Sequence, residues 1–485
     1  MAVNSTIMSE VFVGRKEEKV LLSNALKSKA PELIAVYGRR RVGKTFLIRN
    51  AYSSHMIFEC SGLHNSSLRR QLENFENELT AAGYRFPGKH PINWLAAFQI
   101  LADFAAPLIS MQKRVIFFDE FPWLCTHRSG FLQAFEHFWN TWASRQNNLV
   151  VVICGSAASW MIKNVVKNRG GLHNRITQKI RLLPFTLIET ESFLRARKVN
   201  LDRYQLLQLY MVMGGIPQYL KEVRTGESAT QVIDRVCFTR DGMLNYEFKN
   251  LYFSLFELAS KHIEVVRSLA NKSKGLTRSE IIDACKLSSG GSATALLDEL
   301  SESGFITAYI PFDRTIKDSM YRLTDEYSLF YIKFIEHRKT QGTGTWINYS
   351  REPAWKSWSG YAFESICMKH IPQLKKALEI GGVYTETSAW RFFPKEDLPG
   401  AQIDLIIDRK DGCINICEMK FSIDSFLITK KYFTELENKL KVFRTQTHTK
   451  KTLLLTMITT FGVKENEYKN LAVQNEISMG ALFED

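Results

Sequence analysis

The segment ELIAVYGRRRVGKTFLIRNAY (32–52) limits the fold of this chain more than any other feature. Its apolar start predicts a strand, the sequence GRRRVGKT predicts a tight loop, and a helical pattern follows. Gly38 and Gly43 permit a turn whose backbone N–H groups surround a phosphate. Lys44 then reaches the β- and γ-phosphate oxygens, and Thr45 offers a hydroxyl to Mg²⁺. This strand–loop–helix order predicts a P-loop that binds ATP with Mg²⁺.

A second apolar segment, KRVIFFDEFPWL, ends in the two acids Asp119 and Glu120. Its continuous apolar run predicts a buried parallel strand with both acids at the carboxyl end. We expect Asp119 to hold Mg²⁺ through water and Glu120 to polarise the attacking water, although two acids can also simply cap a strand. A third strand pattern, NLVVVICGSAASW, ends at Ser156. This serine is a candidate γ-phosphate sensor, and a simple turn also accounts for it.

Amphipathic segments alternate with these three strand patterns, which predicts an α/β fold with a doubly wound parallel sheet. The ligand of such a sheet binds at the carboxyl ends of the strands. We therefore expect residues 1–190 to form a P-loop ATPase core and residues 191–250 to form a helical lid.

Six segments together resemble the archaeal and bacterial ATPase family within the AAA+/STAND group of P-loop proteins: VFVGRKEE, GRRRVGKT, FFDEFPWL, CGSAASW, HNRITQKIRLLPFTLIE and MGGIPQYL. The resemblance implies that Val13, Gly14 and Arg15 lie against the nucleotide base. It also implies that Pro217 approaches the adenine from the lid and that Arg175 is directed at the γ-phosphate. From the residues alone, Arg175 is one cation of a basic segment, and a solvated surface or a DNA phosphate contact is equally open.

The charge balance favours a polyanionic partner. The 485 residues include 64 Lys and Arg against 50 Asp and Glu, a formal charge of +14. Residues 1–230 account for 30 of these cations and 17 of the acids, so most of the excess belongs to the ATPase part. We expect ATP and a nucleic acid as partners, with DNA favoured over RNA, and a homo-oligomer is possible. The longest apolar runs have only strand length and the N-terminus lacks a secretion signal, which predicts a cytoplasmic protein without a membrane span.

Residues 251–336 carry the pattern of a winged helix. TRSEIIDACK begins with a capping box, GSATALLDELSESG predicts the recognition helix, and FITAYI and SMYRLTD flank a polar turn that would form the wing. The recognition helix contains Asp298, Glu299 and Glu302 but no Lys or Arg. Because base reading in a major groove requires cations or amides, we favour a structural or regulatory role for this module.

A Gly- and Thr-rich segment at 337–352 predicts a linker, and a separate α/β pattern follows at 353–485. GAQIDLIID and INICEMKF predict a β-hairpin from which Asp404 and Glu418 project towards a common point, with Lys420 on the same face. Two converging carboxylates suit Mg²⁺ or Mn²⁺, and a nearby lysine stabilises developing charge. The pattern indicates phosphodiester cleavage, although charged strands with alternating acids and lysines are common.

With a preceding helix that carries Glu364 and a basic helix after it, this arrangement resembles the PD-(D/E)XK nuclease superfamily. The resemblance implies a restriction-endonuclease-like α/β fold. It makes Asp404 and Glu418 metal ligands, Glu364 an outer ligand and Lys420 the catalytic lysine. Ile403 replaces the proline that precedes the first acid in the superfamily pattern. An inactive nuclease-like binding domain is the alternative.

The chain is thus expected to be a multidomain α/β protein that binds and hydrolyses ATP and controls a metal-dependent nuclease in DNA processing or defence. One alternative is a nucleotide-switched binding or signalling protein whose nuclease-like domain does not cut. Another is a transcriptional regulator that acts through the winged helix.

Overall fold

The computed structural model describes residues 12–86, 90–156, 158–166, 171–172, 174–272, 274–338, 342, 344–350, 352–394 and 399–485. The chain forms two compact units. Unit 1 consists of Met1–Pro184, Ser254–Glu257 and Glu302–Gly304, and unit 2 of Phe185–Phe253, Leu258–Ser301 and Phe305–Asp485. No described helix is both long and apolar enough to cross a lipid bilayer. All eight cysteines are free thiols.

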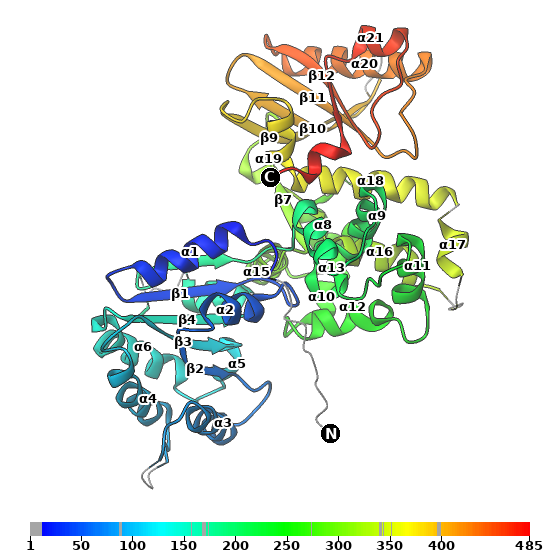
Figure 1. The fold of residues 1–485 in the computed structure, drawn as a ribbon. Coiled ribbons are helices and arrows are strands. Elements are labelled where there is room, and N and C mark those ends of the chain that lie inside the picture. Colours follow the sequence, from blue (N-terminus) through cyan, green and yellow to red (C-terminus); the bar gives the residue numbers. More distant parts are fainter. Residues whose placement is uncertain are drawn as a thin grey trace. The chain divides into compact units, whose positions relative to one another are not determined.

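Unit 1 is built on a five-stranded sheet in which every strand pair is parallel (Figure 1). The strand order is β2-β3-β4-β1-β5, with bounds Met56–Ser61, Arg114–Asp119, Leu149–Gly155, Glu32–Tyr37 and Gln178–Arg181. The central strands are runs of Val, Ile, Leu and Phe because both faces of a covered parallel sheet are buried. The predicted parallel α/β fold of the N-terminal part is confirmed.

Helices of unit 1 supply the apolar side chains that cover this sheet. Aromatic residues of α4 and α6, among them Trp94, Phe98 and Phe135, pack with Phe118 of β3 in one large core. The helices of this unit are α1 (Lys16–Lys27), α2 (Lys44–Tyr52), α3 (Leu68–Ala81), α4 (Trp94–Leu108), α5 (Phe121–Leu124), α6 (Phe131–Thr141), η1 (Ala143–Arg145), α7 (Ala158–Met161) and η2 (Ile162–Val166).

Unit 2 begins with helices that include the predicted lid. They are α8 (Leu187–Ala196), α9 (Arg203–Met213), α10 (Pro217–Leu220), α11 (Ala229–Ile233), η3 (Asp234–Phe238) and α12 (Met243–Phe253). A full capping box between Thr186 and Glu189 starts α8, and Asp202 caps α9. The backbone then turns at Gly214, whose φ is 60°, before Pro217 begins α10.

The described residues between 259 and 323, within the segment predicted as a winged helix, contain three α-helices and a small antiparallel sheet of order β6-β8-β7. Its elements are α13 (Ala259–Ala270), β6 (Leu276–Thr277), α14 (Arg278–Ala284), α15 (Gly291–Glu302), β7 (Ile306–Tyr309), η4 (Ile316–Asp318) and β8 (Met320–Leu323). The predicted capping box of Thr277 and Glu280 is present. In the loop between β7 and β8, Phe312 packs on Phe443 with ring centroids 5.2 Å apart, so this loop is anchored to the C-terminal part of the unit.

The C-terminal part of unit 2 is a mixed five-stranded sheet of order β13-β12-β11-β10-β9 (Figure 1). The hairpin β10–β11 and the pair β9–β10 are antiparallel, whereas β11–β12 and β12–β13 are parallel. The strands are β9 (Thr385–Phe392), β10 (Ala401–Arg409), β11 (Cys413–Lys420), β12 (Thr452–Thr459) and β13 (Asn475–Ser478). The accompanying helices are α16 (Glu326–Phe330), η5 (Tyr331–Ile335), α17 (Thr345–Tyr349), α18 (Pro353–Lys369), α19 (Ile371–Ala377), α20 (Lys430–Thr447), α21 (Glu467–Ala472) and η6 (Met479–Phe483).

The segment 337–352 differs from the linker that its composition predicts. Its residues 345–349 form helix α17, in which Trp346 is fully buried and stacks on Phe238 at 5.7 Å. The carboxylate of Asp234 accepts the backbone N–H groups of Gly344 and Trp346, both at 2.7 Å. Gly344, whose φ is 87°, and Thr345 form the start of this helix, which packs on the neighbouring aromatic core.

Helix α12 ends at Phe253 and α13 begins at Ala259, so α12 crosses the boundary predicted at residue 251.

Gly215 is a position where a side chain has no room. A Cβ atom there would lie 1.8 Å from the carbonyl oxygen of Phe185, whose N–H donates to the carbonyl oxygen of Gly215 at 2.7 Å. We expect Gly215→Ala to lower the free energy of unfolding by about 3 kcal/mol or more, because two paired backbones must separate. Gly381→Ala is the matched control, since nothing lies within 4 Å of its added Cβ. Equal melting temperatures for the two variants would contradict this.

His370 makes the stability of unit 2 depend on pH. Its Nε2 accepts the N–H of Leu187 at 3.2 Å and its Nδ1 donates to the carbonyl oxygen of Ile366 at 2.8 Å, so the buried ring is neutral. Burial lowers the pKa of His370 from 6.5 to about 4. A depressed histidine contributes stability above its unfolded pKa and loses it as the pH falls towards the folded pKa.

We therefore expect His370 to cost about 3 kcal/mol of unfolding free energy between pH 6.5 and pH 4, from about 1.4 kcal/mol per pKa unit. Urea unfolding midpoints of wild type and His370→Gln over this range measure the effect. The glutamine variant keeps an acceptor but cannot be protonated, so its pH slope should be shallower. Parallel slopes would show that His370 titrates normally.

Candidate functional site

The loop after β1 has the backbone geometry that a phosphate cradle requires. Gly38 has a φ of 149°, and a Cβ there would lie 2.3 Å from the carbonyl oxygen of Leu182. Gly43 has a φ of 90° and forms the N-cap of α2. Both conformations are unfavourable for residues with a side chain. The structure thus explains both glycines that the sequence pattern singled out.

The side chain of Lys44 bonds to the backbone of the loop. Its Nζ donates to the carbonyl oxygens of Gly38 and Arg39 at 3.0 and 2.9 Å, and the side chain is buried. Burial lowers the pKa of Lys44 because the ammonium group loses water. A triphosphate bound in this loop offers this ammonium a stronger, anionic acceptor than the two carbonyls.

The side chains of Thr45 and Asp119 are in contact, although Thr45 follows β1 and Asp119 ends β3. The hydroxyl of Thr45 donates to Oδ2 of Asp119 at 2.6 Å. The strand order explains the meeting, since β4 alone lies between the strands that end at the P-loop and at Asp119. A hydroxyl and a carboxylate oxygen pointing at each other are hard donors that fit Mg²⁺. Thr45 and Asp119 are therefore the residues that would hold the ion.

Glu120 is held in a fixed position beside them. Its backbone is left-handed, with φ 43°, and its N–H donates to Oδ1 of Asp119 at 2.9 Å. Its carboxylate accepts the hydroxyl of Ser156 at 2.8 Å and the backbone N–H of Ser156 at 3.3 Å. Ser156 follows β4, between the P-loop strand and the acid strand. In this structure Ser156 contacts Glu120, so its predicted role as a γ-phosphate sensor stays a prediction.

The segment before α1 also lies against the P-loop. The guanidinium of Arg15 is buried and donates to the carbonyl oxygen of Val42 at 3.1 Å. Arg15 has a left-handed backbone, and Gly14 before it has a φ of 69°. The ring of Phe12 meets that of Phe46 in α2 at 5.9 Å. The structure thus brings the segment around Val13 to the loop, and contact with the nucleotide base stays a prediction.

Arg175 and Pro217 are not joined to the P-loop by any described contact. Arg175 is exposed and lies two residues before Thr177, which bonds to the backbone of Leu33 at the start of β1. The P-loop follows the opposite end of this strand. Pro217 belongs to unit 2. Both assigned roles remain predictions.

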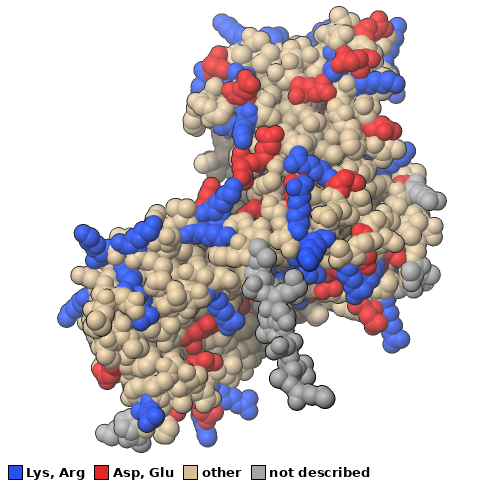
Figure 2. Space-filling view, in the orientation of Figure 1, with Lys and Arg blue, Asp and Glu red and all other residues tan. Residues whose placement is uncertain are grey.

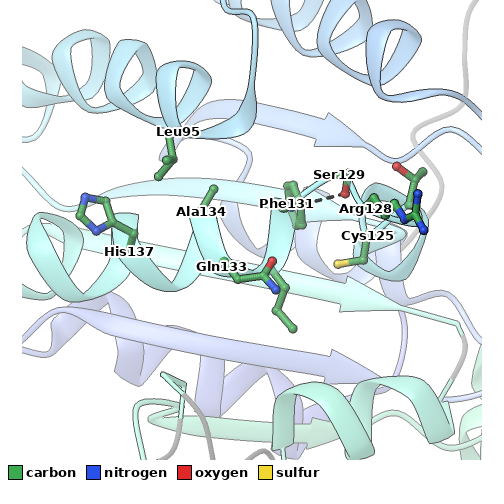
Figure 3. A pocket seen from close by; sticks show the side chains of 11 residues that line it. Leu95, Cys125, Arg128, Ser129, Phe131, Gln133, Ala134 and His137 are labelled. Carbon is green, nitrogen blue, oxygen red and sulfur yellow. Dashed lines mark hydrogen bonds between the residues drawn. The ribbon is translucent and has the colours of Figure 1, made fainter.

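A separate cavity of about 770 Å³ opens in unit 1, between α4 and the start of α6 (Figure 3). The backbone N–H of Phe131 donates to the Ser129 hydroxyl at 3.3 Å at its edge. Its lining contains no residue predicted for the nucleotide site and consists of Leu95, Cys125, Thr126, Arg128, Ser129, Gly130, Phe131, Leu132, Gln133, Ala134 and His137.

In unit 2, the predicted carboxylates of the C-terminal sheet lie on paired strands. Leu405 of β10 is opposite Cys417 of β11, so the antiparallel register continues to Asp404 and Glu418. Glu418 is buried, and its side chain lies 3.8 Å from Nζ of Lys420. The predicted pairing of Asp404, Glu418 and Lys420 on one face is thus present in the structure.

Lysines from outside the hairpin occupy both carboxylates. Nζ of Lys274 lies 2.8 Å from Oδ1 of Asp404, and Nζ of Lys439 in α20 lies 2.5 Å from Oε1 of Glu418. The hydroxyl of Tyr432 donates to Oε2 of Glu418 at 3.0 Å. Burial acts to raise the pKa of Asp404, but the ion pair with Lys274 leaves it below its ordinary value.

Glu364 in α18 belongs to the same neighbourhood. Burial, and then the negative charge of Asp404, raise the pKa of Glu364 to about 7. The three carboxylates nevertheless do not form a metal site as they stand. Within the described ranges, no group of three His, Cys, Asp or Glu side chains is arranged to hold a metal ion. The donors have the right chemistry for Mg²⁺ or Mn²⁺, but lysine ammonium groups take the place of the cation.

Comparison with known proteins bears on the first of these two sites. Residues 12–223 match the family described as "ATPase domain predominantly from Archaea". These residues include the P-loop, Asp119, Glu120 and Ser156. This part of the chain is a P-loop ATPase domain.

One relative extends this similarity beyond the ATPase domain. An uncharacterised protein of Methanocaldococcus jannaschii is 23% identical over 439 residues, which cover 89% of this chain and 92% of that protein. An uncharacterised ATP-binding protein of the same organism is 43% identical over 51 residues, 10% of this chain and 86% of that protein. Among solved structures, a Walker-type ATPase of Pyrococcus abyssi is 18% identical, with a TM-score of 0.46 over 66% of this chain and 95% of that one.

Sequence reasoning missed several residues of these sites. Lys274 contacts Asp404, which is distant in the sequence, and no local pattern marks such a pair. Lys439 and Tyr432 lie seven residues apart on α20, a spacing that places both on one helix face. That spacing is the signal by which they could have been found.

The contact between Ser156 and Glu120 predicts how the ATPase domain responds to mutation. Ser156→Ala removes the hydroxyl bond that orients the glutamate, so we expect kcat for ATP hydrolysis to fall about tenfold with unchanged ATP affinity. Steady-state hydrolysis and binding of a fluorescent ATP analogue measure the two effects, with the exposed Ser110→Ala as control. A loss of affinity at unchanged kcat would show that Ser156 contacts the nucleotide.

Proposed function

We propose that this protein hydrolyses ATP and uses the resulting change to control a C-terminal nuclease-like domain that acts on nucleic acid in DNA processing or defence. The observation that carries the proposal is the presence of two separate phosphate-directed sites in one chain. One is the P-loop with Thr45 and Asp119. The other is the face of the C-terminal sheet that presents Asp404, Glu418 and Lys420.

In the ATPase domain, each residue has a role that follows from its position. Lys44 and the backbone of the P-loop bind the β- and γ-phosphates. Thr45 and Asp119 would hold Mg²⁺, which neutralises phosphate charge when bound. Glu120, oriented by Ser156, accepts the proton of the attacking water.

The order of elements in the C-terminal domain supports a nuclease-like fold. A helix with Glu364 precedes an antiparallel β9–β10–β11 meander, and α20 then crosses to the parallel strand β12. Two strand carboxylates and a lysine on one face are the residue types that metal-dependent phosphodiester cleavage would use. Because lysines occupy the carboxylates, we derive no cleavage step from the present arrangement.

Cations support a nucleic acid partner. Figure 2 shows Lys and Arg side chains on the surface of both units, mixed with Asp and Glu. The edge strand β5 presents Lys179 to solvent, close in sequence to the exposed Arg175. Exposed cations of this kind bind phosphate backbones without reading sequence.

A second function competes with cleavage: a nucleotide-switched protein whose nuclease-like domain binds without cutting. The ion pairs of Lys274 with Asp404 and of Lys439 with Glu418 favour it, since they satisfy both carboxylates without a metal ion. A transcriptional regulator finds less support. In α15, Glu299 is paired with His262 at 2.8 Å, and the helix contains no Lys or Arg to face a groove.

Cleavage assays separate these functions. Purified protein is incubated with Mg²⁺ or Mn²⁺ on single- and double-stranded DNA and on RNA, with and without ATP. We expect wild type to cut and Glu418→Gln to lose at least about 100-fold in rate, because the variant removes a carboxylate that would hold the divalent metal ion. Asp411→Asn, an exposed acid of the adjoining turn, is the control.

Glu120→Gln tests the coupling in the same assay. It should bind ATP without turnover and change the ATP dependence of cutting. If no nucleic acid is cut but one is bound in an ATP-dependent manner, the non-cleaving function is correct. Cutting that is equal in wild type and Glu418→Gln would exclude the proposed site.

A further inference from the structure

Lys274 reaches the carboxylate site from outside the C-terminal domain. It lies between α13 and β6, 130 positions before Asp404, and its Nζ is 2.8 Å from Oδ1 of that residue. The side chains of Lys274 and Asp404 are only 29% and 14% exposed. Shielding from water strengthens such a pair relative to a surface ion pair. The lysine is therefore a specific counter-ion of this carboxylate.

The backbone around Lys274 is held in place. The hydroxyl of Tyr309 in β7 donates to the carbonyl oxygen of Lys274 at 2.6 Å. Gly275, with a φ of 84°, passes so close to β8 that a Cβ would lie 2.4 Å from the carbonyl oxygen of Tyr321. The small β6-β8-β7 sheet thus presents Lys274 as a fixed part of its own structure.

A second cation of the small β6-β8-β7 sheet, Arg322, lies near the helix that carries Glu364. Arg322 in β8 extends to α18, where its Nη2 lies 2.5 Å from Sδ of Met368, one helical turn after Glu364. Residues of one module thus bring positive charge to Asp404 and to the helix that carries Glu364. Movement of that module would withdraw both cations together.

We propose that Lys274 is an internal blocking cation, which occupies Asp404 in the resting protein and must withdraw before the carboxylates bind a divalent metal ion. The inference rests on the proposed nuclease-like function, and it accounts for the disagreement between a donor set with metal-binding chemistry and an arrangement that holds no metal site. An ammonium group and a metal ion compete for the same oxygen, so occupancy by Lys274 lowers metal affinity. Displacement of the small sheet is then the step that makes the site available.

Manganese binding tests this without relying on activity. Nucleotide-free full-length protein is titrated with Mn²⁺, and free ion is followed by electron paramagnetic resonance. We expect Lys274→Ala to bind Mn²⁺ at least about tenfold more tightly than wild type, since the competing cation is gone. Lys274→Arg should behave as wild type. Lys274→Met keeps the aliphatic stem and carries the same test if the alanine variant does not fold.

Two controls locate the effect. Lys272→Ala removes an exposed lysine from the same turn and should leave Mn²⁺ binding unchanged. Asp404→Asn in the Lys274→Ala background should abolish the gained binding. Equal Mn²⁺ affinity of wild type and Lys274→Ala, or gained binding that survives Asp404→Asn, would overturn the blocking role.

The same variants distinguish this inference from the proposed function. Gained Mn²⁺ binding without any cleavage supports the blocking role and contradicts the nuclease. Cleavage by wild type that Lys274→Ala does not accelerate supports the nuclease and contradicts the blocking role.

Discussion

The hydrogen bond between Thr45 and Asp119 depends on the order in which the strands of unit 1 are arranged. With β4 between β1 and β3, the loop after each of these strands opens at the same edge of the sheet. The P-loop, the acid pair and Ser156 therefore converge although they are separated by up to 118 positions, from Gly38 to Ser156. The strained left-handed backbone of Glu120 persists because the surrounding sheet is buried and closely packed.

The two sites differ in how their charges are satisfied. At the P-loop, Lys44 bonds to neutral carbonyl oxygens, so an incoming anion improves its electrostatic environment. At the C-terminal sheet, Asp404 and Glu418 already have ammonium partners, so an incoming cation must replace favourable interactions. The P-loop lysine can therefore bind an anion without losing an ion pair. At the C-terminal sheet, a metal ion must compete with lysine ammonium groups, which weakens its binding.

Sequence reasoning succeeded where function depends on local order. The P-loop, the strand that ends at Asp119 and the β10–β11 hairpin each lie within a short segment, and their periodicity and turn residues identify them. It failed where the burial or the ion pairing of a residue depends on a partner that is distant in the sequence. The burial of Trp346 depends on Phe238, and the state of Asp404 depends on Lys274. For Ser156, the residue was found but its partner was not, because a strand end offers several acceptors.

Asp234 has a consequence for how the chain can be divided. Its buried carboxylate receives two backbone N–H groups from the segment that composition alone would offer as a cutting point between domains. A fragment that ends before this segment keeps Asp234 but loses both donors, which leaves a desolvated charge in an aromatic core. A fragment that begins after it leaves Lys274 behind as well. A cut within this segment therefore changes both of the fragments that it produces.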